Sequence, residues 1–365
     1  MELWKRFKDP ALAQKLLQEL KGLCQGSSQR PTLMEVCGTH TVALSRTGLR
    51  EVLSPYLDLR SGPGCPVCVT DDSDIDLMAE VARQPGVIVA TYGDMLRVPG
   101  SYGTLLDLKA AGARVQLVYS ALDALELARE NPRDTVVMLG VGFETTAPVA
   151  ALAVQRAASE GISNFLMLSL HKTIPNALRA LLAENSRIDG LILPGHVSAI
   201  IGEEPYRFIA EESGVPAVIT GFEAVDMLLG IVELVRLIVA GRPEVLNAYR
   251  RVVSPDGNPR ARALLEEAFR PVAARWRGLG SIPDSGLALA EPFAAYDALQ
   301  ALGLRRPEAR PPRRGCRCGE VLRGLIEPAE CGLFAKACTP HSPVGPCMVS
   351  SEGACAAHYT YGRNG

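Results

Sequence analysis

Eight short apolar runs, each followed at once by a polar loop that is mostly rich in glycine, constrain the fold of this chain more than any other feature. The runs lie at 33–36, 57–59, 87–90, 115–119, 136–139, 165–170, 191–193 and 218–220. Helix-like segments fill the gaps, among them 75–83, 147–158, 175–184 and 203–212. This strand–loop–helix alternation predicts α/β structure with parallel sheets.

The alternation also suggests a division into domains. Eight strands in two sets of four predict two similar α/β domains, at 26–125 and 126–240, which face each other across a cleft. The alternation stops after residue 222, where we expect helices at 222–240, 243–251 and 259–270. Residues 241–365 are expected to form a helical and Cys-rich domain with much irregular structure. An amphipathic helix in residues 1–25 is expected to pack on that C-terminal domain.

Composition excludes several classes of protein. Apolar residues make up 47% of the 365 and charged residues 21%, which is unlike a disordered chain. The net charge of −2 argues against a protein held on nucleic acid by phosphate charge. The start MELWKRFKDP has no apolar core of a signal peptide, and the stretch 227–240 is interrupted by Glu233 and Arg236. We therefore expect a cytoplasmic protein with no membrane or nucleic-acid partner.

The ten cysteines are unevenly placed. Cys24, Cys37, Cys65 and Cys68 precede residue 70, residues 69–315 have none, and the last 50 residues carry six. In the tail, Cys318, Cys331, Cys338 and Cys355 have the pattern C-x12-C-x6-C-x16-C, with Cys316 as an alternative first ligand and Cys347 as a spare. Four converging thiolates can hold zinc or an iron–sulfur cluster. The wide spacing without paired knuckles favours a [4Fe–4S] cluster over zinc, and inert or paired thiols are a further alternative.

Two thiol motifs follow the first two predicted strands. Cys65 and Cys68 form a C-x-x-C pair, which can cycle between dithiol and disulfide or form half of a zinc site. Cys37 and His40, in Cys-Gly-Thr-His, can share a metal or act as nucleophile and base. Further polar residues follow other predicted strands and could form a cleft or partner face rather than merely brace loops: Thr39, Glu144, Thr145, His171, His196, Ser198 and Glu223.

At these motifs the sequence resembles the HypD family of hydrogenase maturation factors. The matching strings are MEVCGTHT at 34–41, GPGCPVCVT at 62–70, GFETTAP at 142–148, PGHVSAIIG at 194–202, GFE at 221–223, CTP at 338–340 and MVSSEGACAA at 348–357. The resemblance covers nearly the whole chain, and these motifs are long and unusual.

The resemblance implies a function in assembling the Fe(CN)2CO part of the [NiFe]-hydrogenase site. It implies a HypC-type chaperone that shares the iron, and a HypE-type cyanide donor that HypF charges with thiocyanate. It implies two similar α/β domains and a third domain around a [4Fe–4S] cluster. By motif match, Cys37 would bind the iron with His40 close by, Cys65 and Cys68 would be the redox pair, and the tail cysteines would hold the cluster.

Release of cyanide from a thiocyanate is formally reductive, so a dithiol pair and a one-electron cluster could supply the electrons. We therefore expect electrons to pass from the tail cluster to Cys65 and Cys68, which support ligand transfer to iron at Cys37. Two other interpretations are a free-standing dithiol oxidoreductase and a zinc-stapled scaffold without redox activity.

Overall fold

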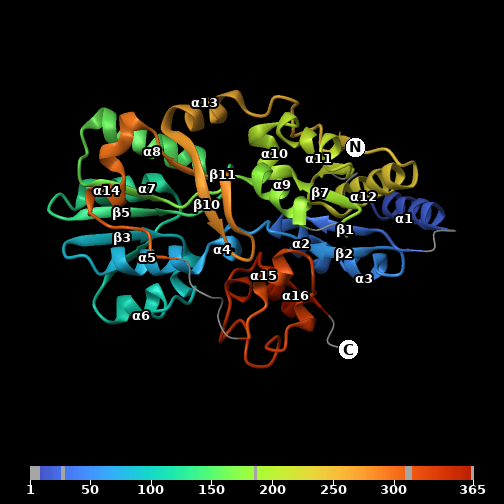
Figure 1. The fold of residues 1–365 in the computed structure, drawn as a ribbon, viewed down its shortest axis with the longest axis horizontal. Coiled ribbons are helices and arrows are strands. Elements are labelled where there is room, and N and C mark those ends of the chain that lie inside the picture. Colours follow the sequence, from blue (N-terminus) through green and yellow to red (C-terminus); the bar gives the residue numbers. More distant parts are fainter. Residues whose placement is uncertain (1–8, 26–28, 185–186, 309–314, 363–365) are drawn as a thin grey trace.

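The computed structural model of the protein describes residues 9–25, 29–184, 187–308 and 315–362. Two α/β units lie side by side along the long axis of the molecule (Figure 1). A Cys-rich region, residues 315–362, packs below their junction, and a long hairpin runs between the two units. The predicted α/β class with two parallel sheets and a Cys-rich C-terminal region is confirmed.

The first sheet has five parallel strands in the order β2-β1-β7-β8-β9. These strands are β1 (Thr32–Glu35), β2 (Asp58–Ser61), β7 (Gly190–Pro194), β8 (Ala217–Thr220) and β9 (Val245–Asn247). The second sheet has four parallel strands in the order β4-β3-β5-β6. They are β3 (Val87–Thr91), β4 (Arg114–Leu117), β5 (Thr135–Gly140) and β6 (Phe165–Ser169).

All eight predicted strands are present, but their predicted grouping is wrong. The chain leaves the first sheet after β2, builds the whole second sheet, and then returns with β7 to lie beside β1. The expected boundary at residue 125 therefore falls inside the second sheet, since β3 pairs directly with β5. Strands that are buried on both faces have similar apolar sequences, so the pattern does not reveal which strands pair.

Helices cover both faces of each sheet, as parallel sheets require. In the first unit, one sheet face packs against α9–α11 and the other against α1, α2 and α12. The helices of this unit are α1 (Pro10–Cys24), α2 (Gly38–Arg46), α3 (Leu49–Leu53), α9 (Ile174–Glu184), α10 (Gly195–Ile201), η3 (Glu204–Tyr206), α11 (Arg207–Glu211) and α12 (Ala224–Val239).

The second sheet is covered in the same way, with α5 and α6 on one face and α7 and α8 on the other. Its helices, with those packed around it, are α5 (Asp72–Ala82), η2 (Gly93–Arg97), α6 (Leu105–Ala110), α7 (Ala121–Glu130), α8 (Ala147–Glu160), α13 (Pro259–Ala268), η4 (Glu291–Tyr296) and α14 (Ala298–Ala301). The remaining short helices carry or adjoin cysteines: α4 (Pro66–Val69), α15 (Cys318–Leu322), η5 (Pro328–Glu330), η6 (Pro346–Met348) and α16 (Ala354–Tyr361).

Three further expectations need correction. The N-terminal helix α1 packs on α12 of the first unit through Leu16 and Leu20, and not on the C-terminal region. The helix expected at 243–251 is replaced by β9, a three-residue edge strand too short to show a period. The helix expected at 259–270 ends at Ala268, where the hairpin of β10 (Phe269–Trp276) and β11 (Gly280–Leu289) begins.

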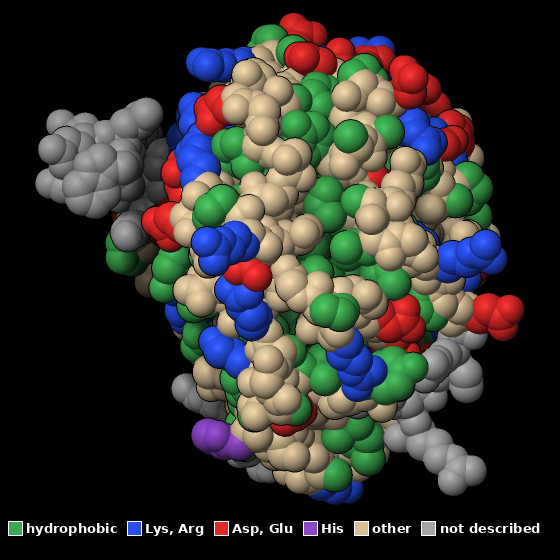
Figure 2. Space-filling view, turned by 90° about the vertical axis from the view of Figure 1, so that its left-hand side faces the viewer, with side chains coloured by type: hydrophobic (Ala, Val, Ile, Leu, Met, Phe, Trp, Pro, Cys, Tyr) green, Lys and Arg blue, Asp and Glu red, His purple; other side chains and the backbone are tan. Residues whose placement is uncertain are grey.

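The charged surface of the second unit is mixed in sign. Figure 2 views the end of the molecule that this unit forms, and basic and acidic side chains are interspersed over the face. Among the described helices, none is both long enough and apolar enough to span a membrane. The most apolar stretch of the sequence forms α12, which is buried against the first sheet.

Candidate functional site

A cleft of about 830 Å³ lies where the carboxyl ends of the two sheets meet. Its walls come from the loops that follow β1, β2 and β7 of the first sheet and β3, β4 and β5 of the second, together with residues 350–352 of the Cys-rich region. The polar residues and cysteines of the lining are Cys37, Thr39, Cys65, Tyr92, Asp94, Tyr119, Thr145, Thr146, His196, Ser350, Ser351 and Glu352. The predicted cleft between the two sheets is therefore present.

Cys37 lies at the start of α2 and is 8% exposed. Its position depends on a close approach of two loops, in which the Gly38 amide donates to the Gly64 carbonyl at 3.0 Å. A Cβ atom on Gly64 would lie 2.3 Å from the Cys37 nitrogen, so glycine is required there. Burial raises the pKa of the Cys37 thiol to about 11, although hydrogen bonds from the His40 amide and the Thr39 side chain oppose the rise.

Glu352 reaches the cleft from the Cys-rich region. Its Oε1 accepts a hydrogen bond of 2.8 Å from the Thr39 hydroxyl, and its negative charge adds to the rise in the pKa of Cys37. The backbone of Glu352 also packs against Gly38, where a Cβ atom would approach its carbonyl oxygen to 2.5 Å. Glu352 carries no signal of a site residue in the sequence beyond its place in the MVSSEGACAA string.

His40 faces away from the cleft. Its Nε2 lies 3.0 Å from the Gly221 carbonyl, so Nε2 carries the proton, and its ring stacks on Phe222 with centroids 4.6 Å apart. Burial lowers the pKa of His40 to about 4, which keeps the ring neutral. His196 stacks on the same Phe222 ring at 3.9 Å and does line the cleft. Cys37 and His196 therefore line the cleft together and His40 does not, while the expected place of His40 beside the iron stays a prediction.

Cys65 and Cys68 lie at either end of the first turn of α4, with their sulfur atoms 2.7 Å apart. Cys65 lines the cleft, whereas Cys68 is fully buried. The β10–β11 hairpin fixes this segment, because Arg277 bonds the Thr70 carbonyl and pairs with Asp72 at 2.7 Å. The Cys-x-x-Cys pair thus connects the cleft to the interior of the protein.

The thiol contacts continue from Cys68 into the Cys-rich region. Cys68 lies beside Cys347, Cys347 beside Cys318, and Cys318 beside Cys316. Burial is the main reason that the pKa of Cys68 is raised well above the usual thiol value. A continuous series of neighbouring thiols therefore runs from the cleft to the tail cysteines.

The remaining tail cysteines form a second group. Cys355 interacts electrostatically with Cys338, Cys316 and Cys331, and its pKa is raised mainly by burial. The Val344 amide donates to the Cys338 sulfur at 3.3 Å, and a Cβ on Gly345 would come within 2.6 Å of the Cys316 sulfur. All six tail cysteines line one small cavity, whose other walls include Val321, Leu333, Phe334 and Met348.

This donor set fits an iron–sulfur cluster. Four thiols, an apolar shell and an amide that donates to sulfur are the features by which proteins hold such clusters. Within residues 9–25, 29–184, 187–308 and 315–362, no three Cys, His, Asp or Glu side chains meet closely enough to bind a single metal ion. The tail sulfurs instead surround a cavity.

Four of the predicted cleft residues lie elsewhere. Glu144 is buried and its Oε1 accepts from the Ile174 amide at 2.9 Å. His171 is buried beside Ser169, with its pKa lowered to about 4 by burial. Ser198 bonds the Pro194 carbonyl, and Glu223 caps α12 with Asp226. Of the predicted face, the residues that line the cleft are Thr39, Thr145 and His196.

The fold and the site define a thiol-rich α/β protein in which a line of cysteines joins an intersheet cleft to a cavity lined by six cysteines. The HypD family profile, described as "Hydrogenase formation hypA family", matches residues 11–362. The hydrogenase maturation factor HypD of Rhodobacter capsulatus is 45% identical over 99% of this chain and 98% of its own length. The proteins of the same name from Cupriavidus necator and Escherichia coli K12 are 44% and 42% identical, over 98% and 96% of their lengths and 100% and 97% of this chain. The chain belongs to the HypD family.

Proposed function

We propose that this protein is a hydrogenase maturation factor that assembles the Fe(CN)2CO moiety together with a HypC-type chaperone and a HypE-type cyanide donor. Family membership over the whole chain and the names of its relatives support this proposal. The observation that carries it is the position of Cys37, a buried thiol in a cleft that also contains one end of a line of thiols.

Cys37 is the proposed ligand of the iron. A soft thiolate suits low-valent iron that carries cyanide and CO. Binding of the metal would remove the thiol proton, which the raised pKa of about 11 otherwise retains at neutral pH. Thr39, Glu352 and His196 surround the iron position in this proposal, and His40 supports the loop through Phe222 and Gly221.

Cys65 and Cys68 are the proposed redox pair. Cleavage of a protein thiocyanate consumes two electrons and gives a thiolate and cyanide. Oxidation of two thiols to a disulfide releases two electrons and two protons. Oxidation of the pair once therefore supplies the electrons for the release of one cyanide. The 2.7 Å contact between the two sulfur atoms supports this role, as does the position of Cys65 in the cleft wall.

For a [4Fe–4S] cluster, we propose the ligands Cys316, Cys331, Cys338 and Cys355. The electrostatic contacts of Cys355 with the other three support this set. Cys318 and Cys347 lie between that group and Cys68, which suits thiols that connect the cluster to the redox pair. A cluster bound there would supply single electrons.

The test of the iron site is infrared spectroscopy of the protein purified with its chaperone. The variant Cys37→Ala is expected to lose the CN and CO bands completely. The matched control is Cys24→Ala, since Cys24 lies on α1 away from the cleft. CN and CO bands of normal intensity in Cys37→Ala would contradict the assignment.

The test of the cluster ligands is iron and sulfide analysis of anaerobically purified variants. Cys316→Ser is expected to lose the cluster, whereas Cys318→Ser and Cys347→Ser should keep its visible absorbance. The reverse result for Cys316 and Cys318 would restore the set that begins at Cys318.

Turnover of a small disulfide substrate without any partner protein would instead favour a free-standing oxidoreductase.

A further inference from the structure

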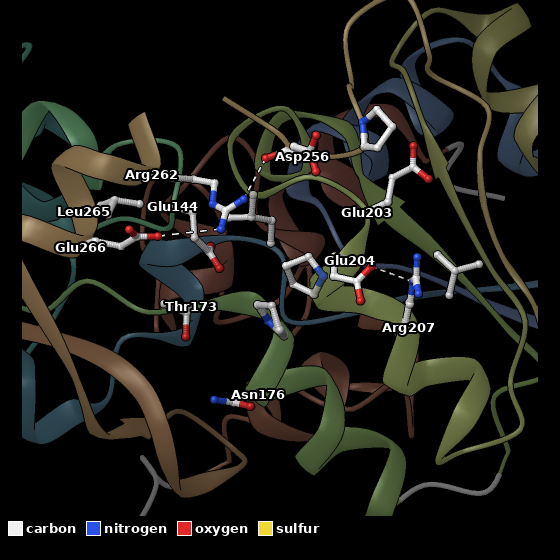
Figure 3. A pocket seen from close by; sticks show the side chains of 15 residues that line it. Glu144, Thr173, Asn176, Glu203, Glu204, Arg207, Asp256, Arg262, Leu265 and Glu266 are labelled. Carbon is white, nitrogen blue, oxygen red and sulfur yellow. Dashed lines mark hydrogen bonds and ion pairs between the residues drawn. The ribbon is translucent and has the colours of Figure 1, made fainter. Parts of the chain in front are cut away.

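A second cavity of about 770 Å³ lies beside the thiol cleft and shares none of its lining residues. It is bounded by the start of α9, the end of α10, residues 203–207, β9, residues 255–256 and α13 (Figure 3). The loop after β5 contributes to both cavities, because Phe143 and Thr145 face the thiol cleft and Glu144 faces the second cavity. A volume of this size is typical of small-molecule sites.

Glu144 is the residue that most needs an explanation. It is 3% exposed, and its Oε1 is bonded to the first amide of α9. Its Oε2 has no hydrogen-bond partner among the described residues. A buried carboxylate oxygen without a donor costs free energy, so such an oxygen in the wall of a cavity indicates a donor that arrives with a ligand.

The charge of the cavity wall indicates the sign of the charge on that ligand. Five carboxylates line it, at Glu144, Glu203, Glu204, Asp256 and Glu266. The two arginines of the lining are already ion-paired, Arg207 with Glu204 at 2.7 Å and Arg262 with Glu266 at 3.8 Å. In the described part of the chain, no cationic side chain of the wall pairs with Glu144, Glu203 or Asp256, which favours a cationic ligand.

The rest of the lining is aliphatic. Ile201, Val245 and Leu265 contribute apolar side chains, and Pro175, Pro205 and Pro255 add ring carbons. A hydrated metal ion would gain nothing from such walls, whereas an alkyl chain would lose contact with water there. Burial also raises the pKa of Glu144 to about 7, which a nearby cation would reverse.

We propose that this cavity binds a small aliphatic amine or guanidine, with the cationic group at Glu144 Oε2 and the carbon chain along Leu265, Ile201 and Val245. The ammonium or guanidinium supplies the N–H donor that Glu144 lacks, as a charge-assisted hydrogen bond. This site is independent of the thiol chemistry, because none of its residues is a cysteine or a neighbour of one in sequence.

Isothermal titration calorimetry of the full-length protein with pentylguanidine tests the proposal. The uncharged hexanamide, which has the same chain length, serves as the matched probe. We expect saturable one-to-one binding of pentylguanidine and at least about tenfold weaker binding of hexanamide. Absence of saturable pentylguanidine binding, or equal affinity for the two probes, would overturn the proposal.

Two variants locate the site. Glu144→Gln should weaken pentylguanidine binding by about tenfold or more, and Leu265→Trp should weaken it by filling the aliphatic side. The control Glu130→Gln makes the same charge change at the end of α7, outside the cavity, and should leave the affinity unchanged. Unaltered binding by either cavity variant would contradict the location, and Leu265→Trp decides the matter if Glu144→Gln does not fold.

Discussion

The two parallel-sheet units are built alike but contribute differently to the cleft. In the first unit, the loops after β1 and β2 carry Cys37, Cys65 and Cys68. In the second unit, the corresponding loops present hydroxyls and rings, such as Tyr92, Tyr119 and Thr145. One unit therefore supplies the thiols of the cleft, and the other closes the cleft with hydroxyls and rings. The same strand-end geometry serves both, since function depends on the loops.

The largest difference between the units should appear in hydrogenase maturation. Cys65→Ser in the first unit is expected to abolish maturation while the visible absorbance of the cluster stays intact, because the redox pair is lost and the tail cysteines are not. The control Thr145→Val in the second unit removes a hydroxyl from the same cleft and should lower maturation far less. Measurement of hydrogenase activity in cells that carry each variant tests this contrast. Full maturation with Cys65→Ser would reject the electron path.

A smaller contrast concerns the glycines that follow strands. Gly64→Ala should lower the free energy of unfolding by about 3 kcal/mol, because the new Cβ would lie 2.3 Å from the Cys37 backbone nitrogen. Gly93→Ala follows β3 in the second unit, where the nearest atom lies 3.5 Å away at the Leu117 side chain, and should change stability little. Denaturant unfolding of both variants measures the difference. Equal stability of the two would show that the loop approach at Cys37 is not tight.

The smallest contrast is between two buried carboxyls. Glu35 in the first unit pairs with Arg50, whereas no cationic side chain of the described residues pairs with Glu144 in the second. The pKa of Glu144 in the folded protein is about 7, above the usual 4.5, so folding favours the protonated carboxyl. The contribution of Glu144 to the free energy of unfolding is therefore complete below pH 4.5 and is lost as the pH rises through 7. The free energy of unfolding of Glu144→Gln, measured relative to the parent protein, should therefore be about 2 kcal/mol higher at pH 8 than at pH 5. Glu35→Gln should destabilise it at pH 8, since Arg50 loses its partner.

Denaturant unfolding at the two pH values tests this pair. A Glu144→Gln variant with the same stability difference from the parent at pH 5 and pH 8 would show that Glu144 is ionised in the folded state throughout. The two variants have the same change of charge and size, so each is a control for the other.

Much of the site could be predicted from sequence because its signals are local. A turn such as Cys37-Gly-Thr-His or Cys65-Pro-Val-Cys fixes its own residues within a few bonds, and each follows a recognisable apolar run. The direction of the His40 ring is something that local reasoning does not reveal. Three residues from Cys37 along α2, its ring points to Phe222 and Gly221 of another strand-end loop, and His196 occupies the cleft instead.

The sequence by itself determined the α/β class, the eight strands, the positions of the thiol motifs and the separate tail cysteines, since hydrophobic periodicity and residue chemistry are properties of short segments. The tertiary structure decided the rest. It returned β7 to the side of β1, brought Glu352 to Cys37, and placed Cys347 between Cys68 and Cys318. All of these contacts except that of Cys347 with Cys318 join residues more than 100 positions apart. Burial and packing of the whole chain select them rather than any local preference.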